Sequence, residues 1–140
     1  ESNILNGQIM IRVSFIIIFI SLLACNALPS QNISKIIDVN EFDKKSKSVK
    51  DVVIIDLRTE KEVVKGIIPG AIQMDFYKDD FSNNLKQLDK DKTYMVYCGS
   101  GGRSGKTAKL MSDQGFKEVY DLKGGITAWK EEGKEIGELK

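Results

Sequence analysis

The chain has 140 residues, which is enough for one domain of ordinary size. Hydrophobic residues make up 41% of it and charged residues 29%, a globular composition that argues against wholesale disorder, collagen or a coiled coil. The 21 Lys and Arg nearly balance the 20 Asp and Glu, and the net charge of +1 creates no field that would draw the chain to nucleic acid or a membrane surface. The sequence has no His, which excludes Ser-His-Asp and Cys-His catalysis and His-bearing zinc or haem sites.

The apolar segment from Val13 to Ala24 is typical of the hydrophobic region of a secretory signal peptide. It is too short for an ordinary transmembrane helix, which needs about 20 residues. Met10 is a candidate start, so residues 1–24 are interpreted as upstream sequence plus signal peptide. The segment ends in Leu-Leu-Ala followed by Cys25, which resembles the bacterial lipobox, where the Cys is lipidated. Signal cleavage after Ala27 is one alternative, and a buried element of the fold is another.

Export would place the protein in the periplasm or at the surface of a bacterium. A lipid on Cys25 would hold it at a membrane without a segment that spans the bilayer. Residues 25–34 would form a polar tether, and the domain would occupy residues 35–140. The chain has two Cys, so processing at Cys25 would leave Cys98 as the single free thiol and would exclude an intramolecular disulfide. A lone thiol in an oxidising compartment must be buried or used.

Strands and helices alternate along the rest of the chain. In chain order we expect a strand at Lys35–Asp38, a helix at Val39–Ser48, a strand at Val52–Asp56, a helix at Thr59–Lys65, a short strand at Ala71–Met74, a helix at Phe76–Leu88, a strand at Thr93–Tyr97, a helix at Ser104–Gln114, a strand at Glu118–Leu122 and a helix at Ile126–Glu132. This alternation predicts a doubly wound α/β domain, with a central, mostly parallel sheet of about five strands and helices on both faces. Ligands of such sheets bind beyond the carboxyl ends of the strands, where Cys98 lies.

Cys98 opens a glycine-rich loop between an expected strand and an expected helix. Glycine permits turns with φ > 0, in which successive backbone N–H groups converge, and a helix start adds the positive end of its dipole. The pattern predicts an anion cradle around a sulfur that is favoured as thiolate. We therefore interpret Cys98 as the catalytic nucleophile. The expected substrate-binding residues of the loop are Gly99, Ser100, Gly101, Gly102, Arg103 and Ser104. The alternative is a buried Cys before a generic turn.

Two charged residues lie at the end of another expected strand, at the same edge of the sheet. Arg58 is a candidate substrate contact, and Asp56 is expected to tie neighbouring loops together by hydrogen bonds. The alternative is a structural ion pair between them. Trp129 is expected in the core. No acidic group shows metal-ligand spacing, so we expect neither a metal nor a cofactor.

Four segments, in this order, resemble the motifs of single-domain rhodaneses, a family of sulfurtransferases. The segment Ile54–Glu62 resembles D-V-R-x-x-x-E, Gly66–Ile72 resembles G-H-I-P-G-A-I, Cys98–Ser104 resembles C-x-x-G-x-R-S and Gly124–Trp129 resembles G-G-x-x-x-W. The resemblance covers residues 35–140. Ile67 stands where the family usually has His. Sulfur transfer needs no imidazole base, so we expect this departure to affect packing or the loop near the site and not to abolish the chemistry.

The resemblance implies a doubly wound α/β fold and a thiosulfate sulfurtransferase activity. Cys98 would take sulfane sulfur from a small anionic donor such as thiosulfate, carry it as a persulfide, and pass it to cyanide, a thiol or an acceptor protein. No nucleic acid partner is expected, and the membrane would be contacted only through the lipid anchor. One alternative is a persulfide carrier or binding module without turnover. The other is a Cys-based phosphatase or arsenate reductase, although the tyrosine-phosphatase pattern C-x5-R is one residue longer than the spacing from Cys98 to Arg103.

Overall fold

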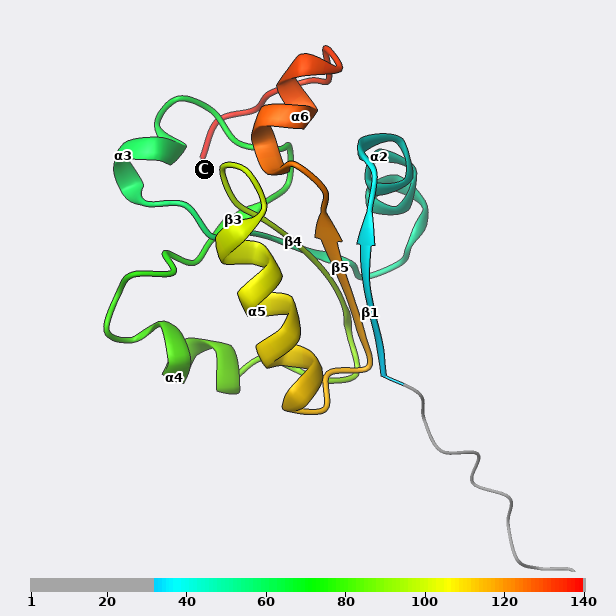
Figure 1. Cartoon of the computed structure of the whole chain (residues 1–140), viewed down its shortest axis with the longest axis vertical. Helices are drawn as coiled ribbons and strands as arrows, with labels where there is room; N and C mark the ends of the chain where they lie inside the picture. Colours follow the sequence, from blue (N-terminus) through cyan, green and yellow to red (C-terminus); the bar gives the residue numbers. More distant parts are fainter. Residues whose placement is uncertain (1–31, 140) are drawn as a thin grey trace, which may run out of the picture. The chain divides into compact units, whose positions relative to one another are not determined.

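A parallel sheet forms the centre of the computed structural model, which describes residues 32–139 (Figure 1). Its strands are β1 (Ile33–Ile37), β2 (Val53–Asp56), β3 (Ile72–Gln73), β4 (Thr93–Tyr97) and β5 (Glu118–Leu122). They lie in the order β1-β5-β4-β2-β3, and every neighbouring pair is parallel. The predicted α/β class and the number of strands are confirmed.

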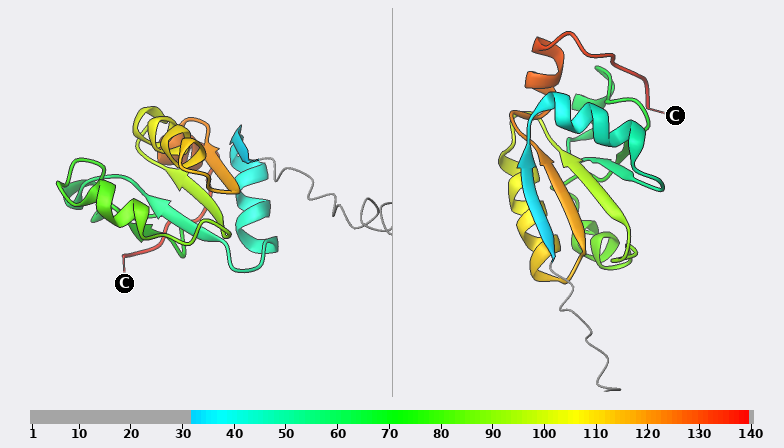
Figure 2. Two further views of the ribbon diagram at one scale, coloured as in Figure 1. Left: turned by 90° about the horizontal axis from the view of Figure 1, so that it is seen from below. Right: turned by 90° about the vertical axis from the view of Figure 1, so that its right-hand side faces the viewer.

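Helices cover both faces of the sheet. They are α2 (Val39–Ser48), α3 (Glu60–Val63), α4 (Phe81–Lys86), α5 (Gly102–Asp113) and α6 (Gly125–Glu131). One core joins the sheet to residues of α2, α3 and α6, and a second core joins it to residues of α4 and α5. In the right-hand view of Figure 2, α2 and α5 lie on opposite sides of the sheet.

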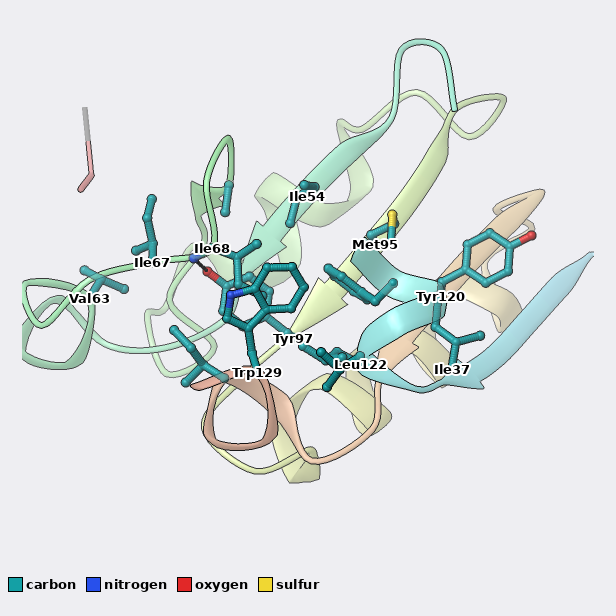
Figure 3. Close-up of a cluster of buried hydrophobic side chains, with 14 residues drawn as sticks. Ile37, Ile54, Val63, Ile67, Ile68, Met95, Tyr97, Tyr120, Leu122 and Trp129 are labelled. Atoms are coloured by element: carbon teal, nitrogen blue, oxygen red, sulfur yellow. Dashed lines mark hydrogen bonds between the residues drawn. The ribbon is translucent and has the colours of Figure 1, made fainter. Parts of the chain in front are cut away.

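The two cores follow from the alternation of side chains along each strand. On β4, Met95 and Tyr97 point to the α2 and α6 side, whereas Tyr94 and Val96 point to the α4 and α5 side. Figure 3 shows the first core, in which the Trp129 indole lies among aliphatic side chains and the ring of Tyr97. Trp129 is 3% exposed, as expected for a core residue. Cys98 continues the alternation and belongs to the second core.

Three elements begin two or more residues away from the start that the sequence predicts. Strand β1 begins at Ile33, so the last two residues assigned to the tether belong to the sheet, where β1 pairs with β5. Helix α4 begins only at Phe81, because the Asp75 carboxylate accepts the Tyr77 N–H and favours a turn before it. Helix α5 begins at Gly102, because Gly101, with φ of 106°, turns the chain directly into the helix.

The expected signal peptide, Cys25 and most of the polar tether lie outside the described residues. Within residues 32–139, the structure contains no helix with the length and apolar character needed to cross a bilayer.

Candidate active site

The Cys98 sulfur lies inside the turn between β4 and α5. The residue is 1% exposed, and the loop folds back over it. The N–H of Gly101 donates to Sγ at 3.1 Å, and the Ser104 hydroxyl lies 3.5 Å from Sγ. Both donors belong to the loop that the sequence predicts to form an anion cradle.

The surroundings of Cys98 stabilise its thiolate. Burial by itself raises the pKa of the thiol. Hydrogen bonds from the Ser104 hydroxyl and from the backbone N–H groups of Ser104, Gly101 and Ser100 outweigh that effect, so the pKa of Cys98 lies below the ordinary thiol value. The residue is therefore activated by main-chain dipoles and one hydroxyl, without an imidazole.

The start of α6 holds the loop in this shape. The N–H of Ile126 donates to the Cys98 carbonyl at 2.9 Å, and the N–H and hydroxyl of Thr127 donate to the Gly99 carbonyl at 3.1 and 2.9 Å. In a trans peptide the N–H points away from the C=O, so the Gly99 carbonyl that points to α6 turns the Ser100 N–H toward the sulfur. Gly125 makes this approach possible, because a Cβ there would collide with the Cys98 carbonyl oxygen.

Arg103 braces the loop from the other side. Its guanidinium makes two hydrogen bonds to the Glu62 carboxylate, at 2.7 and 2.8 Å, and lies over the Tyr77 ring at 5.6 Å. Glu62 in turn accepts the Thr59 N–H and hydroxyl. The Arg103 hydrogen bonds are the main cause that lowers the pKa of Glu62 to about 2, so this carboxylate stays charged and the pair stays closed.

Arg58 does not lie at the Cys98 loop. It is 4% exposed, and its guanidinium donates to the Asp56 carboxylate and to the carbonyls of Glu62 and Gly66. Asp56 is fully buried and also accepts the Arg58 N–H. Arg58 therefore forms the structural ion pair that was the alternative to a substrate contact, and Asp56 bonds to Arg58 of its own segment, so its expected role in tying neighbouring loops together stays a prediction. The sequence could not decide this, because it does not show which way a side chain turns after a strand.

Ile67 lies in the core, 2% exposed. Its N–H and carbonyl pair with Gly137. The adjacent Ile68 N–H donates to the Tyr97 hydroxyl at 3.0 Å, as the dashed line in Figure 3 shows. The residue in the usual His position is therefore a core residue.

Four residues near the loop were not singled out as site residues. Three of them fall inside or beside the matched motifs, namely Glu62, Gly125 and Thr127. The motifs therefore marked their positions without indicating what these residues do. Asp121, on β5, carried no such signal: it is 3% exposed, and its carboxylate lies beside Gly105 of α5. Among residues 32–139, no three His, Cys, Asp or Glu side chains gather in a way that could hold a metal ion.

Comparison with known proteins agrees with this geometry. The family model for the Rhodanese-like domain matches residues 31–132. A sulfurtransferase of Allochromatium vinosum is 35% identical over 100 residues, which cover 68% of this chain and 92% of that protein. The thiosulfate sulfurtransferase GlpE of Coxiella burnetii is 37% identical over 81 residues, covering 58% of this chain and 74% of the relative. The crystal structure of a rhodanese-like domain protein from Staphylococcus aureus superposes with a TM-score of 0.64 and 30% identity, covering 76% of this chain and 99% of that one.

Proposed function

The chain belongs to the Rhodanese-like domain family, and from that membership we propose that it is a thiosulfate-type sulfurtransferase that works through a persulfide on Cys98. One observation carries the proposal: Cys98 Sγ lies at the end of a central strand, surrounded by backbone N–H groups and the Ser104 hydroxyl. Its relatives include sulfurtransferases. The cradle stabilises a sulfur anion whether the negative charge rests on Cys98 itself or on a sulfur attached to it.

In the first step, the Cys98 thiolate attacks the outer sulfur of thiosulfate. A new S–S bond forms, the S–S bond of thiosulfate breaks, and sulfite leaves with the bonding electron pair. Cys98 then carries a persulfide anion, which the N–H groups of the cradle and the start of α5 stabilise. No proton transfer is needed, which suits a site without imidazole.

In the second step, cyanide or an acceptor thiolate attacks the terminal sulfur of the persulfide. The persulfide S–S bond breaks, the acceptor leaves with the sulfur, and the Cys98 thiolate is restored. A protein thiol is a third class of acceptor. Lys106 is exposed near the start of α5, so it can attract an anionic donor while Arg103 is paired with Glu62.

The geometry favours this proposal over a Cys-based phosphatase. A Cys-based phosphatase needs its loop Arg to face the phosphate, whereas Arg103 faces away toward Glu62. The loop from Cys98 to Arg103 is also one residue shorter than the tyrosine-phosphatase pattern C-x5-R. A persulfide carrier shares the site with the enzyme, and only turnover distinguishes the two.

The test uses the full chain and its Cys98→Ser variant, both reduced beforehand. Thiosulfate is added and the intact mass is recorded without reductant, followed by cyanide and a second mass. We expect one added sulfur atom, absent in Cys98→Ser and lost with cyanide. A sulfur that loads without repeated thiocyanate release would establish the carrier, and no loading would overturn the proposal.

For the N-terminal segment we propose export and lipidation at Cys25, which rest on the sequence pattern alone. Growth of a bacterium that expresses the full chain with radiolabelled palmitate tests this. Label is expected in the full chain and not in Cys25→Ala. Unlabelled protein trimmed after Ala27 would instead establish ordinary signal cleavage.

A further inference from the structure

A small pocket opens on the α2 side of the sheet, which is the other face from the core that holds Cys98. Its walls come from α2, β2, the loop before β3, α6 and the segment after α6, and its volume is about 200 Å³. The pocket is therefore separate from the Cys98 loop, and the proposed sulfur transfer makes no use of it.

One side of the pocket is apolar. Ile54 of β2, Ile68 of the loop before β3 and Trp129 of α6 line it, and all three are buried members of the first core. Figure 3 shows the Trp129 indole beside Ile68, with Ile54 on the same side of the sheet. The indole N–H already donates to the Glu135 carbonyl at 2.7 Å, so the ring presents only apolar surface. This side of the pocket suits a hydrocarbon group.

The other side of the pocket has more hydrogen-bond donors than acceptors. Lys47 Nζ lies 2.6 Å from Asp43 Oδ1, and Lys134 Nζ donates to Asp43 Oδ2 at 3.1 Å. Both oxygens of this carboxylate are therefore engaged, whereas each ammonium group keeps N–H donors that Asp43 does not use. The polar group that best completes this arrangement is an acceptor with negative charge, such as a carboxylate.

The charges that line the pocket favour the same ligand. Two lysines share Asp43, and the side chains of Lys134 and Asp43 are only 24% and 19% exposed. Glu135 also lines the pocket, but it is exposed, so water and salt screen its charge more strongly than that of Lys134. The positive charge of Lys134 therefore acts at short range beside the apolar side.

The volume of the pocket limits the size of the ligand. An apolar cavity of about 150 Å³ is large enough to hold benzene. A pocket of about 200 Å³ therefore has room for a single ring that carries a short polar group, and it is too small for a ligand of nucleotide size.

We propose that this pocket is a binding site for a small aromatic carboxylate. The ring lies against Ile54, Ile68 and Trp129, and the carboxylate accepts the free N–H groups of Lys134 and Lys47. The bound ligand joins α2 to the segment after α6, which Asp43 and Lys134 already connect. The site does not depend on the proposed function at Cys98.

The fluorescence of Trp129 tests this proposal, because it is the single Trp of the chain and lines the pocket. Benzoate, benzylamine or acetate is added to the full chain at constant ionic strength. Benzylamine keeps the ring and reverses the charge, whereas acetate keeps the carboxylate and lacks the ring. We expect a saturable change with benzoate, half complete at a concentration at least about tenfold lower than with either of the others. No saturable change with benzoate, or an equal response to benzylamine or acetate, overturns the proposal.

Lys134→Gln tests whether this ammonium group holds the carboxylate. The variant should raise the benzoate concentration for half-saturation by about tenfold, because a charge-assisted hydrogen bond is lost. Lys44→Gln is the matched control, since Lys44 is an exposed neighbour of Asp43 on α2 that does not line the pocket, and it should leave that concentration unchanged. Equal effects of the two variants overturn the proposal.

A second measurement locates benzoate without any variant and covers the case in which Lys134→Gln does not fold. The Trp129 indole N–H and the methyl groups of Ile54 and Ile68 are followed by NMR as benzoate is added to the full chain. These signals should shift together, whereas the methyl groups of Val119, in the second core, should not. Shifts that leave Trp129, Ile54 and Ile68 unchanged overturn the proposal.

Discussion

At the scale of single residues, ion pairing and main-chain dipoles stabilise the charged groups of the site. Cys98 takes its acidity from N–H groups and one hydroxyl, and Arg103 neutralises Glu62 instead of facing the sulfur. The positive charge nearest the loop is therefore used to hold the loop's shape. This division explains how a chain without His can present a reactive thiol.

The Glu62–Arg103 pair should make stability depend on pH in the acid range. The pKa of the Glu62 carboxyl group falls from its usual value of 4.5 to about 2 in the folded chain, chiefly through the Arg103 hydrogen bonds. A lowered folded-state pKa adds stability that is fully present above pH 4.5 and is lost as the pH falls toward 2. Glu62→Gln should therefore destabilise the protein at neutral pH, and the difference should shrink as the solution is acidified.

Urea unfolding at several pH values measures that difference. Glu60→Gln is the matched control, because Glu60 lies in the same helix and pairs with Lys78 at the surface, where an ion pair contributes little. Equal effects of the two variants at neutral pH would contradict the structural role of the Glu62 pair.

At the scale of elements, the contact between α6 and the Cys98 loop positions the site. The first turn of α6 donates to two loop carbonyls, and it can come this close only because Gly125 has no side chain. The G-G-x-x-x-W segment thus combines two functions: its glycines allow the approach, and Trp129 anchors the helix in the core.

Gly125→Ala should disrupt both stability and the site. Its φ is 58°, and the added methyl group would collide with the Cys98 carbonyl and lie 2.7 Å from the Gly99 oxygen. We expect a loss of about 2–4 kcal/mol in the free energy of unfolding, from backbone strain plus overpacking. Persulfide loading at Cys98 should fall with it, since the loop carbonyls must move.

Gly133→Ala separates strain from collision. Gly133 also has a positive φ, 68°, but nothing lies within 4 Å of an added Cβ. It should cost only about 1 kcal/mol in urea unfolding and leave persulfide loading unchanged. If both variants behaved alike, the close approach of α6 to the loop would not be what matters.

At the scale of the whole molecule, the C-terminal segment closes the domain beyond the residues that the family model matches. Gly137 exchanges two backbone hydrogen bonds with Ile67, and the Glu135 carbonyl accepts the Trp129 indole N–H at 2.7 Å. Ile136 packs beside Gly66. The segment after α6 therefore ties the loop before β3 to the last helix.

Truncation after Glu132 should destabilise the protein by about 3 kcal/mol, because the hydrogen bonds it removes include the three named above and leave the Ile67 N–H and the Trp129 indole N–H unpaired. Trp129 is the single Trp of the chain, so its fluorescence reports the unfolding directly. Truncation after Gly137 keeps all three bonds and should cost little. Equal stability of the two shortened chains would show that the tail does not close the domain.

The local elements could be predicted from sequence because they depend on neighbours along the chain. Helix α2 and strands β4 and β5 have the bounds that periodicity predicts, and Asp38 caps α2 by accepting the Glu41 N–H. Errors occurred where a side chain competes for the backbone, as Asp75 does before α4, or where a left-handed glycine starts a helix, as Gly101 does before α5.

By itself, the sequence determined the fold class, the place of Cys98 after a buried strand, and the glycine loop that surrounds its sulfur. Folding in three dimensions was needed to show which distant groups reach that loop: Glu62 bonds to Arg103, 41 residues away, and the start of α6 bonds to the loop carbonyls. Periodicity along a chain reports which residues are buried. It does not report strand order or the direction of a buried charge, because both depend on packing between segments far apart in the chain.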